Sequence, residues 1–451
     1  MKVTVIGTGY VGLTTGAALA YLGHDVTFVD KKPEIVEKLS AGTPTIHESG
    51  LAELMAAGRQ RSTFQQAIPE LSGERVVLIA VGTPSKENGD ADLKYVDSAA
   101  TDLADRIQEG ARLVVVNKST VPVGSARHVY GIITRRLAAR GVKAEIHVAS
   151  NPEFLAEGRA VHDSLYPDRI VVGSDTPHPL AVMRELYAPI LEQTFESPAG
   201  TPRPERFELP PLITTTTASA ELTKYAANAF LATKISFINE FSVLAEKVGA
   251  DVVEVARAIG LDSRIGSKFL NAGIGWGGSC FGKDTAAVLA LGGSYDYQMP
   301  LVRAAVDVNR RQRLYVVEKL QHHLKVLRGT TIGLLGLAFK GNTDDLRDAP
   351  ALTLIRELVE RGAVLRVHDP VAIPNAKALY PDLPVEYAAT ELELAEACDA
   401  LVVVTDWPQY RRLDFQALAG AMRGDLLLDA RNLLQASTVT DAGLNYVGIG
   451  R

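Results

Sequence analysis

The stretch VTVIGTGYVG, residues 3–12, determines how the beginning of the chain is expected to fold. Its first four residues are β-branched, which favours a strand. Gly7, Gly9 and Gly12 then follow with the G-x-G-x-x-G spacing, and the alanine-rich residues after them favour a helix. A strand, a tight glycine turn and a helix bring unpaired N–H groups close to a pyrophosphate. The stretch therefore predicts a dinucleotide-binding unit.

An acidic residue at the end of the next predicted strand, residues 26–30, supports this interpretation. Asp30 lies eighteen residues after Gly12, where a carboxylate is expected to bind a ribose 2′-hydroxyl. Lys31 and Lys32 follow it and offer positive charge to the 2′-phosphate of NADP. Since two lysines on an exposed turn are more often simply solvated, we expect NAD rather than NADP.

Composition and cysteine usage restrict the class of protein. The 451 residues are 47% apolar and 22% charged, a balance that excludes disorder and a coiled coil. The net charge of -6 gives no general basic field, so nucleic acid is not an expected partner. Two cysteines indicate a reducing compartment, for which the cytoplasm is the default. The uncharged run over residues 3–23 resembles a secretory signal, but Gly7, Gly9, Gly12 and Gly16 favour strand, turn and helix.

The rest of the chain predicts two α/β domains and a helical region between them. Short β-branched runs alternate with helical stretches up to residue 149, and strand-like runs return at residues 331–335, 364–368, 401–405 and 425–429. Five prolines over 196–211 predict an exposed linker or loop. Residues 218–249 hold no proline and, before Gly249, no glycine, which predicts one long helix able to bridge domains and to pair with a second copy. We expect two Rossmann-like, doubly wound parallel-sheet domains, with boundaries at 1–212, 213–320 and 321–451.

Three pairs of polar residues stand four positions apart, so that each pair would share one face of a helix. They are Glu153 with Glu157, Lys224 with Asn228, and Cys280 with Asp284. Asn151-Pro152 predicts a helix start before the first pair. The alternatives left open are a solvated face for the glutamates, a snorkelling lysine, and an inert buried thiol.

The surroundings of Cys280 favour a reactive thiol. GGSCFGKD, residues 277–284, places it at a glycine-rich turn beside Lys283, conditions that stabilise a thiolate. Cys398 lies on the apolar approach to a strand and is expected to be structural. The nine histidines have no metal-ligand spacing, so no metal is expected. Ser279 lacks the second glycine of a nucleophile elbow.

Taken together, these motifs resemble the UDP-glucose/GDP-mannose dehydrogenase family over nearly the whole chain. The matching segments are residues 7–13 (GTGYVGL), 82–84 (GTP), 118–122 (KSTVP), 151–158 (NPEFLAEG), 166–169 (YPDR), 221–230 (ELTKYAANAF), 269–284 (FLNAGIGWGGSCFGKD) and 336–350. The resemblance implies oxidation of C6 of UDP-glucose twice, with NAD as oxidant, to a carboxylate. A thiol captures the aldehyde as a thiohemiacetal, which the second oxidation converts to a thioester.

The resemblance also implies roles for individual residues. Cys280 would be the nucleophile, Lys224 and Asn228 would stabilise the oxyanion, Asp284 and Thr120 would hold a water, and Glu153 would be the general base. The cofactor would contact Gly7, Gly9, Tyr10, Val11, Gly12, Asp30, Thr83, Thr120, Glu157, Lys283 and Arg347. The nucleotide sugar would contact Phe154, Leu155, Glu157, Lys224, Asn228, Phe269, Leu270, Asn271, Ala272, Gly273, Gly277, Lys340 and Arg431, with Arg264 delivered by the second subunit of a homodimer.

Two rival classes of protein are also consistent with parts of this sequence. A hydroxyacid-type dehydrogenase also combines a Rossmann domain with a helical Lys-x-x-x-Asn, but it removes one hydride and needs no cysteine. A non-catalytic NAD-binding sensor would need none of Cys280, Lys224 and Asp284. A third alternative is that the substrate is another nucleotide sugar. The yield of NADH per substrate separates the hydroxyacid-type dehydrogenase from a four-electron enzyme.

Overall fold

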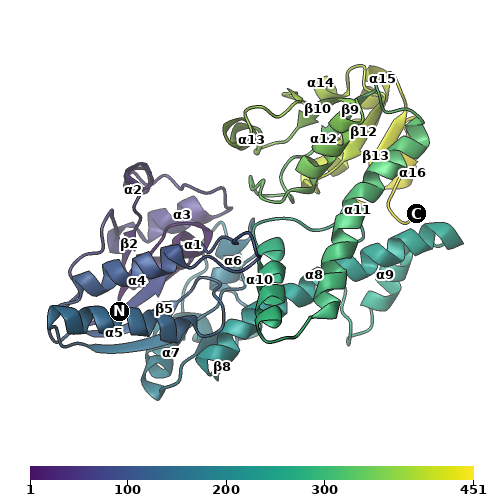
Figure 1. Cartoon of the computed structure of the whole chain (residues 1–451). Coiled ribbons are helices and arrows are strands. Elements are labelled where there is room, and N and C mark those ends of the chain that lie inside the picture. The colour runs from purple at the N-terminus through teal and green to yellow at the C-terminus, as the bar shows by residue number, and fades with distance from the viewer. The chain divides into compact units, whose positions relative to one another are not determined.

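A computed structural model describes residues 1–451 and divides into two α/β units, each with its own sheet (Figure 1). The N-terminal unit comprises residues 1–227 and 286–291, and the C-terminal unit comprises 228–285 and 292–451. The three domain boundaries expected from the sequence stay a prediction.

The sheet of the N-terminal unit has eight strands in the order β3-β2-β1-β4-β5-β6-β7-β8. Its first six strands follow the order 3-2-1-4-5-6 of a doubly wound dinucleotide-binding sheet. Only one residue pair, Ser150 with Gly173, joins β6 to β7, and that contact is antiparallel. The strands are β1 (Lys2–Ile6), β2 (Asp25–Val29), β3 (Ser62–Gln65), β4 (Glu74–Ile79), β5 (Arg112–Asn117), β6 (Glu145–Ser150), β7 (Ile170–Gly173) and β8 (Leu212–Thr215).

Helices cover both faces of this sheet, which explains why its central strands are continuous β-branched runs. One buried cluster packs β4 and β5 against α4 and α5, and another packs β1, β4 and β5 against α1, α3, α6 and α7. The helices are α1 (Tyr10–Tyr21), α2 (Pro33–Ser40), α3 (Leu51–Ala57), α4 (Lys94–Arg106), α5 (Ser125–Arg140), α6 (Ala160–Leu165) and α7 (Pro177–Glu192).

The predicted long helix is confirmed as α8 (Thr217–Val248). Thr216 caps its start, because the hydroxyl of Thr216 accepts a hydrogen bond from the Ser219 N–H at 3.2 Å. Gly249, with φ of 72°, follows its end as a left-handed C-terminal glycine. At 1.5 Å per residue the helix is about 48 Å long.

The C-terminal unit repeats the topology of the first. Its sheet has the order β11-β10-β9-β12-β13-β14, which is again 3-2-1-4-5-6. The strands are β9 (Thr331–Leu335), β10 (Val364–His368), β11 (Glu386–Tyr387), β12 (Ala400–Val403), β13 (Leu426–Asp429) and β14 (Asn445–Val447). The helices after α8 are α9 (Val252–Gly260), α10 (Phe281–Ser294), α11 (Pro300–Leu324), α12 (Pro350–Glu360), α13 (Ile373–Leu379), α14 (Glu391–Ala395), α15 (Phe415–Ala421) and α16 (Ala436–Asp441). Of these, α10 contributes its residues 286–291 to the N-terminal unit.

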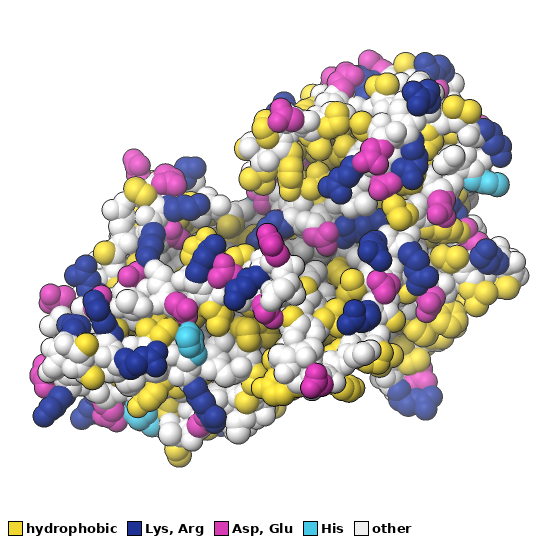
Figure 2. All heavy atoms as spheres, in the orientation of Figure 1, with side chains coloured by type: hydrophobic (Ala, Val, Ile, Leu, Met, Phe, Trp, Pro, Cys, Tyr) yellow, Lys and Arg dark blue, Asp and Glu magenta, His cyan; other side chains and the backbone are white.

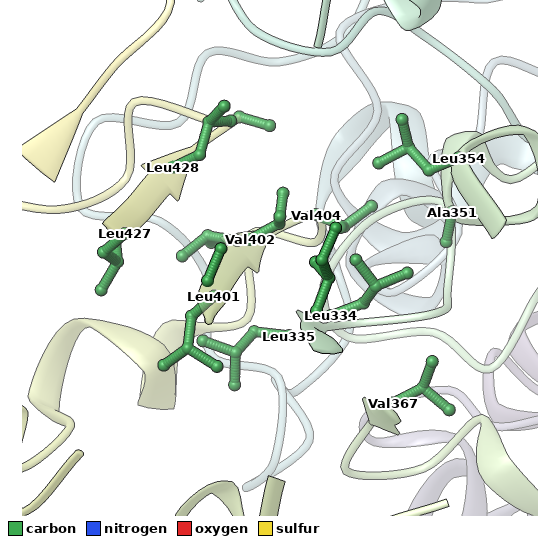
Figure 3. Packing of buried hydrophobic residues seen from close by; sticks show 14 of the residues in the cluster. Leu334, Leu335, Ala351, Leu354, Val367, Leu401, Val402, Val404, Leu427 and Leu428 are labelled. Atoms are coloured by element: carbon green, nitrogen blue, oxygen red, sulfur yellow. The ribbon is translucent and has the colours of Figure 1, made fainter. Parts of the chain in front are cut away.

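The core of this second sheet is apolar on both faces. Figure 3 shows that consecutive residues of β12, Leu401 and Val402, point to opposite sides of the strand, and both are fully buried. Leu354 of α12 belongs to the same buried cluster. The expected fold class, two doubly wound parallel-sheet domains with a long central helix, is confirmed.

One local expectation needs correction, and another is resolved between its two alternatives. Asn151-Pro152 starts no helix: residues 151–156 are irregular, and the next helix, α6, begins only at Ala160. For the proline-rich segment 196–211, the loop is the alternative that the structure shows: the segment belongs to the N-terminal unit and leads into β8 of its sheet.

On the face shown in Figure 2, acidic and basic side chains are interspersed and form no continuous basic surface. None of the helices is both long enough and apolar enough to cross a membrane.

Candidate active site

In the glycine loop after β1, two glycines are required by close packing, and a third faces open space. A side chain at Gly7, whose φ is 95°, would meet the Ala80 carbonyl oxygen at 2.7 Å, and one at Gly12 would meet the Gly7 carbonyl oxygen at 1.9 Å. Nothing lies within 4 Å of a Cβ added at Gly9, the N-cap of α1. Packing therefore explains Gly7 and Gly12, whereas Gly9 leaves clear the approach to a helix N-terminus, as the pyrophosphate of NAD requires.

Asp30 lies directly after β2 and beside this loop. Its carboxylate accepts hydrogen bonds from the Thr8 hydroxyl at 2.6 Å, the Thr8 N–H at 3.2 Å and the Lys32 N–H at 3.1 Å. Lys31 is directed to α4, where its ammonium pairs with Asp102 at 2.7 Å. Both features favour NAD, since the acid is fixed at the loop and one of the two candidate cations for a 2′-phosphate is engaged elsewhere.

Other expected cofactor residues lie around the same end of the sheet. The Thr83 hydroxyl donates to the Thr120 carbonyl oxygen at 2.8 Å and thereby joins the loops that follow β4 and β5. The Tyr10 hydroxyl donates to the His47 carbonyl oxygen at 2.6 Å. Val11 packs at the edge of the core, and Glu157 is half-buried in the turn that precedes α6.

A buried ion pair is the most distinctive feature of the N-terminal unit. Glu153 follows β6, Lys224 projects from α8, and their carboxylate oxygen and ammonium lie 3.0 Å apart with only 7% and 4% of the side chains exposed. The second oxygen of Glu153 accepts from the Leu155 N–H at 2.6 Å. The ring of Phe154 lies 5.6 Å from the Lys224 ammonium and stacks on the Arg169 guanidinium at 3.7 Å. Glu153 and Lys224 therefore act as a pair, and the alternative of a snorkelling lysine is wrong.

The pair determines the protonation state of Glu153. Burial alone would raise the pKa of this carboxyl, but the Lys224 charge and hydrogen bond, the Leu155 N–H and the Lys118 charge together hold the pKa below its ordinary value. Glu153 is thus a carboxylate at neutral pH and is able to accept a proton.

Cys280 lies in the C-terminal unit at the N-cap of α10. Its thiol is partly exposed, and the Ser279 hydroxyl lies 3.5 Å from the sulfur. The start of a helix favours negative charge, which is the setting in which a thiolate is stabilised. Cys398 is fully buried, its thiol donates to the Leu394 carbonyl oxygen, and burial raises its pKa to about 11, so it is an inert core residue as expected.

Asp284 lies one helical turn after Cys280, and its N–H donates to the Cys280 carbonyl oxygen at 2.8 Å. Its buried carboxylate accepts from the Asn228 amide at 2.5 Å and pairs with the Lys283 ammonium. The predicted i, i+4 geometry is confirmed for this pair and for Lys224 with Asn228, which share α8. It is wrong for Glu153 with Glu157, which lie on no helix.

Several of the residues expected to contact the substrate are engaged in packing or hydrogen bonds within the protein. Leu270 and Ala272 are buried in a small cluster with α8 and α9, so that only their backbone is available to a ligand. Gly273 donates its N–H to the Asn239 side chain at 2.8 Å and accepts from Gln312 at 2.9 Å. A Cβ at Gly277 would lie 2.3 Å from the Asp348 carbonyl oxygen. Phe269 and Asn271 are exposed.

The expected cationic contacts have different settings within the C-terminal unit. Arg431 donates to the carbonyl oxygens of Val404, Gly275 and Phe339 at 2.7, 3.2 and 2.7 Å, so it holds three segments together. The Lys340 ammonium lies 5.4 Å from the Phe339 ring. Arg347 forms a bidentate pair with Asp345, and Arg264, with 87% of its side chain exposed, pairs with Asp262. The ligand contacts of these residues stay predictions.

The second Rossmann-like unit lacks a comparable dinucleotide loop. After β9, the N–H groups of Leu337 and Ala338 both donate to the carboxylate of Asp369, at 2.8 and 3.0 Å. Asp369 follows β10 and is the topological counterpart of Asp30. Because α12 begins only at Pro350, no helix N-terminus directly follows the turn at Gly336, and NAD is assigned to the first unit alone.

Comparison with known proteins agrees with this division. Three models of the UDP-glucose/GDP-mannose dehydrogenase family match the chain: the NAD binding domain over residues 1–191, the central domain over 218–311 and the UDP binding domain over 333–436. A UDP-glucose 6-dehydrogenase of Rhizobium meliloti is 44% identical, with full coverage of both chains, and one of Bacillus subtilis is 42% identical over all of this chain and 93% of that protein. A UDP-glucose dehydrogenase structure from Pyrobaculum islandicum is 37% identical with a TM-score of 0.85, covering 100% and 97% of the two chains.

The fold and the site thus define an NAD-dependent dehydrogenase. The chain belongs to the UDP-glucose/GDP-mannose dehydrogenase family.

Proposed function

We propose that this protein oxidises C6 of UDP-glucose to the carboxylate of UDP-glucuronate in two successive steps. The observation that carries the proposal is Cys280 at the start of α10, since a thiol nucleophile is what distinguishes a four-electron oxidation from a simple alcohol dehydrogenation. Curated UDP-glucose 6-dehydrogenases that match the full chain at 42 and 44% identity support the same substrate.

The chemistry balances with the residues present. When bound, NAD accepts the hydride at each of the two oxidations. The C6 alcohol loses a hydride and a proton to give the aldehyde, and the Cys280 sulfur adds to it to give a thiohemiacetal. Loss of a second hydride and proton gives the thioester, and water then cleaves the carbon–sulfur bond to release the carboxylate and the thiol.

The side-chain roles follow from charge and protonation. Lys224, which forms the buried ion pair with Glu153, would stabilise the developing oxyanion together with the Asn228 amide. Glu153, a carboxylate at neutral pH, would take a proton from the hydrolytic water. Asp284, held by Asn228 and Lys283, would position a water with Thr120. These assignments are proposals, as are the expected contacts to cofactor and sugar.

The experiment that tests the function measures NADH and product across a panel of nucleotide sugars. We expect about two NADH per UDP-glucose, with UDP-glucuronate as product. A yield of one with free aldehyde would refute the thioester route and favour a single-hydride dehydrogenase. Higher kcat/KM on another nucleotide sugar would correct the substrate while leaving the chemistry in place.

A trapping experiment tests the separate role of Glu153. Glu153→Gln keeps the shape but removes the base, so that hydrolysis slows while both hydride transfers remain possible. Mass spectrometry after mixing with NAD and UDP-glucose should find a sugar-nucleotide adduct on the peptide that contains Cys280. A burst of NADH without that adduct would mean that one of the two residues has been given the wrong role.

We also propose a cytoplasmic homodimer formed through α8. Phe230, Phe237, Phe241, Leu244 and Val248 lie three, four or seven residues apart and are 40–67% exposed. Figure 2 shows hydrophobic side chains gathered over the end of α8 and over α9. An apolar stripe of this spacing suits pairing with a second copy, which would also bring Arg264 to the partner's substrate. The chain has only two cysteines and they form no disulfide, which supports a reducing compartment.

A further inference from the structure

Lys118, at the end of β5, carries a charge into the interior without a carboxylate at ion-pair distance. The residue is 8% exposed, and its ammonium donates to the Asn151 side-chain oxygen at 3.0 Å and to the Tyr187 hydroxyl at 3.4 Å. The ammonium also lies 5.8 Å from the centre of the Tyr187 ring. Burying an ammonium among neutral partners is unfavourable, so the charge is expected to serve a purpose other than stability.

The surroundings fix this ammonium in one position. The Asn151 amide nitrogen donates to the Val171 carbonyl oxygen at 2.7 Å, which orients the Asn151 oxygen toward its two donors. The second of those donors is the Tyr187 hydroxyl, at 2.6 Å. The N–H of Lys118 is in turn bonded to the Ile79 carbonyl oxygen in β4. The network therefore holds a charged group at a defined place.

The nearby group on which this charge acts is the carboxylate of Glu153, two residues after Asn151. We propose that Lys118 is a positioning residue that shares with Lys224 the neutralisation of Glu153, so that Glu153 remains ionised when Lys224 turns its ammonium to the substrate oxyanion. The inference rests on the proposed role of Glu153 as the general base.

The charged groups on the elements around Glu153 are consistent with a neutralisation that Lys118 and Lys224 share. Lys118 follows β5 and Lys224 belongs to α8. Before β7, Arg169 stacks on the Phe154 ring, with Asp168 next to it in sequence. The Lys118 charge contributes to the lowered pKa of Glu153. With Lys224 engaged by an oxyanion, Lys118 is the remaining lysine that keeps this carboxylate from taking up a proton.

The test is the pH dependence of thioester hydrolysis in Lys118→Gln, followed as the lifetime of the Cys280 adduct after rapid mixing with NAD and UDP-glucose. Glutamine still donates to Asn151 but carries no charge. We expect the acid limb of hydrolysis to move up by about one pH unit, which is about a tenfold loss on that limb and recovery at higher pH. Lys118→Arg, which keeps the charge, should move it much less.

Two controls separate this role from a structural one. Tyr187→Phe removes a donor from the same network without changing charge and should leave the limb in place, as should Lys143→Gln at an exposed lysine. An unmoved limb in Lys118→Gln, or an equal shift in Tyr187→Phe, would overturn the inference. If Lys118→Gln does not fold, Lys118→Met is a second variant that removes the same charge.

The same assay keeps the two proposals apart. If Glu153→Gln fails to lengthen the adduct lifetime, the general-base role of Glu153 is refuted, whatever Lys118 does. If Glu153→Gln lengthens the lifetime and Lys118→Gln leaves the limb unmoved, only the role of Lys118 is lost.

Discussion

Replacing Lys224 by methionine should destabilise the N-terminal unit more than any surface substitution on the same helix. Methionine is unbranched and of similar length, so the packing changes little while the charge is lost. The remaining Glu153 carboxylate would be 7% exposed with no ammonium at 3.0 Å. Removing one partner of a buried pair costs about 3–5 kcal/mol, and since Lys118 still contributes some neutralisation we expect about 3 kcal/mol. At about 2–4 °C per kcal/mol the unfolding midpoint would fall by roughly 10 °C.

The loss of unfolding free energy in Lys224→Met should depend on pH, and the direction of this dependence follows from the protonation of Glu153. Because the pKa of this carboxyl is lowered in the folded protein, the pair contributes stability above the unfolded pKa of glutamate, about 4.3, and loses it as pH falls through the folded pKa. In Lys224→Met only the Leu155 N–H and the Lys118 charge still oppose the effect of burial, so the Glu153 carboxyl takes up a proton more readily than in the wild type. The deficit should therefore be large at pH 7.5 and smaller at pH 5.

Thermal unfolding of the ligand-free protein, followed by circular dichroism at both pH values, measures this prediction. Lys224→Met, Glu153→Gln and the double variant form a cycle, and the double variant should recover most of the loss because neither member of the pair is left buried without the other. Lys247→Met, at an exposed lysine on α8, is the control and should change stability by less than about 0.5 kcal/mol. A deficit below about 1 kcal/mol at pH 7.5, or an equal deficit at both pH values, would refute the reasoning.

Three further predictions concern the chemistry, the cofactor and assembly. Cys280→Ser leaves a far poorer nucleophile, so turnover should fall by several powers of ten while titration still finds NAD bound; near-normal turnover would exclude a thioester. The wild-type protein should favour NAD over NADP in kcat/KM, and Asp30→Asn should narrow that ratio; equal use of both by the wild type would contradict the role of Asp30. Phe237→Glu should shift light scattering from dimer to monomer, and a monomeric wild type at micromolar concentration would contradict the α8 interface.

Both sheets could be largely predicted because their central strands are β-branched runs buried on two faces. The predicted strands at 331–335 and 364–368 coincide with β9 and β10, and the glycine- and proline-free run became α8. The strands that sequence reasoning missed, including β3 and β11, lie mainly toward the sheet edges and are short or partly polar. Such strands lack a continuous apolar pattern because one side of the ladder faces no neighbour.

The failure at Glu153 has a local cause. Proline at position 152 suits the first turn of a helix, but the Glu153 carboxylate accepts the Leu155 N–H two residues on and so offers the backbone an alternative to helical bonding. Gly158, with φ of 83°, then turns the chain toward α6. The irregular backbone places the Glu153 carboxylate against the Lys224 ammonium.

The meeting of Lys118, Glu153 and Lys224 follows from strand order rather than from any local motif. Asn117, the last residue of β5, is paired in register with Ser150, the last residue of β6, so residues 118 and 151 leave the sheet side by side. The first turns of α8 are tied to the same edge by Glu221, whose carboxylate accepts from the Ser150 hydroxyl at 2.9 Å and from the N–H groups of Gly124 and Ala126 at the start of α5. Lys224, one turn further along α8, is thereby carried to Glu153. A lysine directly after an apolar strand is the signal that could have singled out Lys118, because in a parallel sheet the carboxyl ends of the strands are where ligands bind.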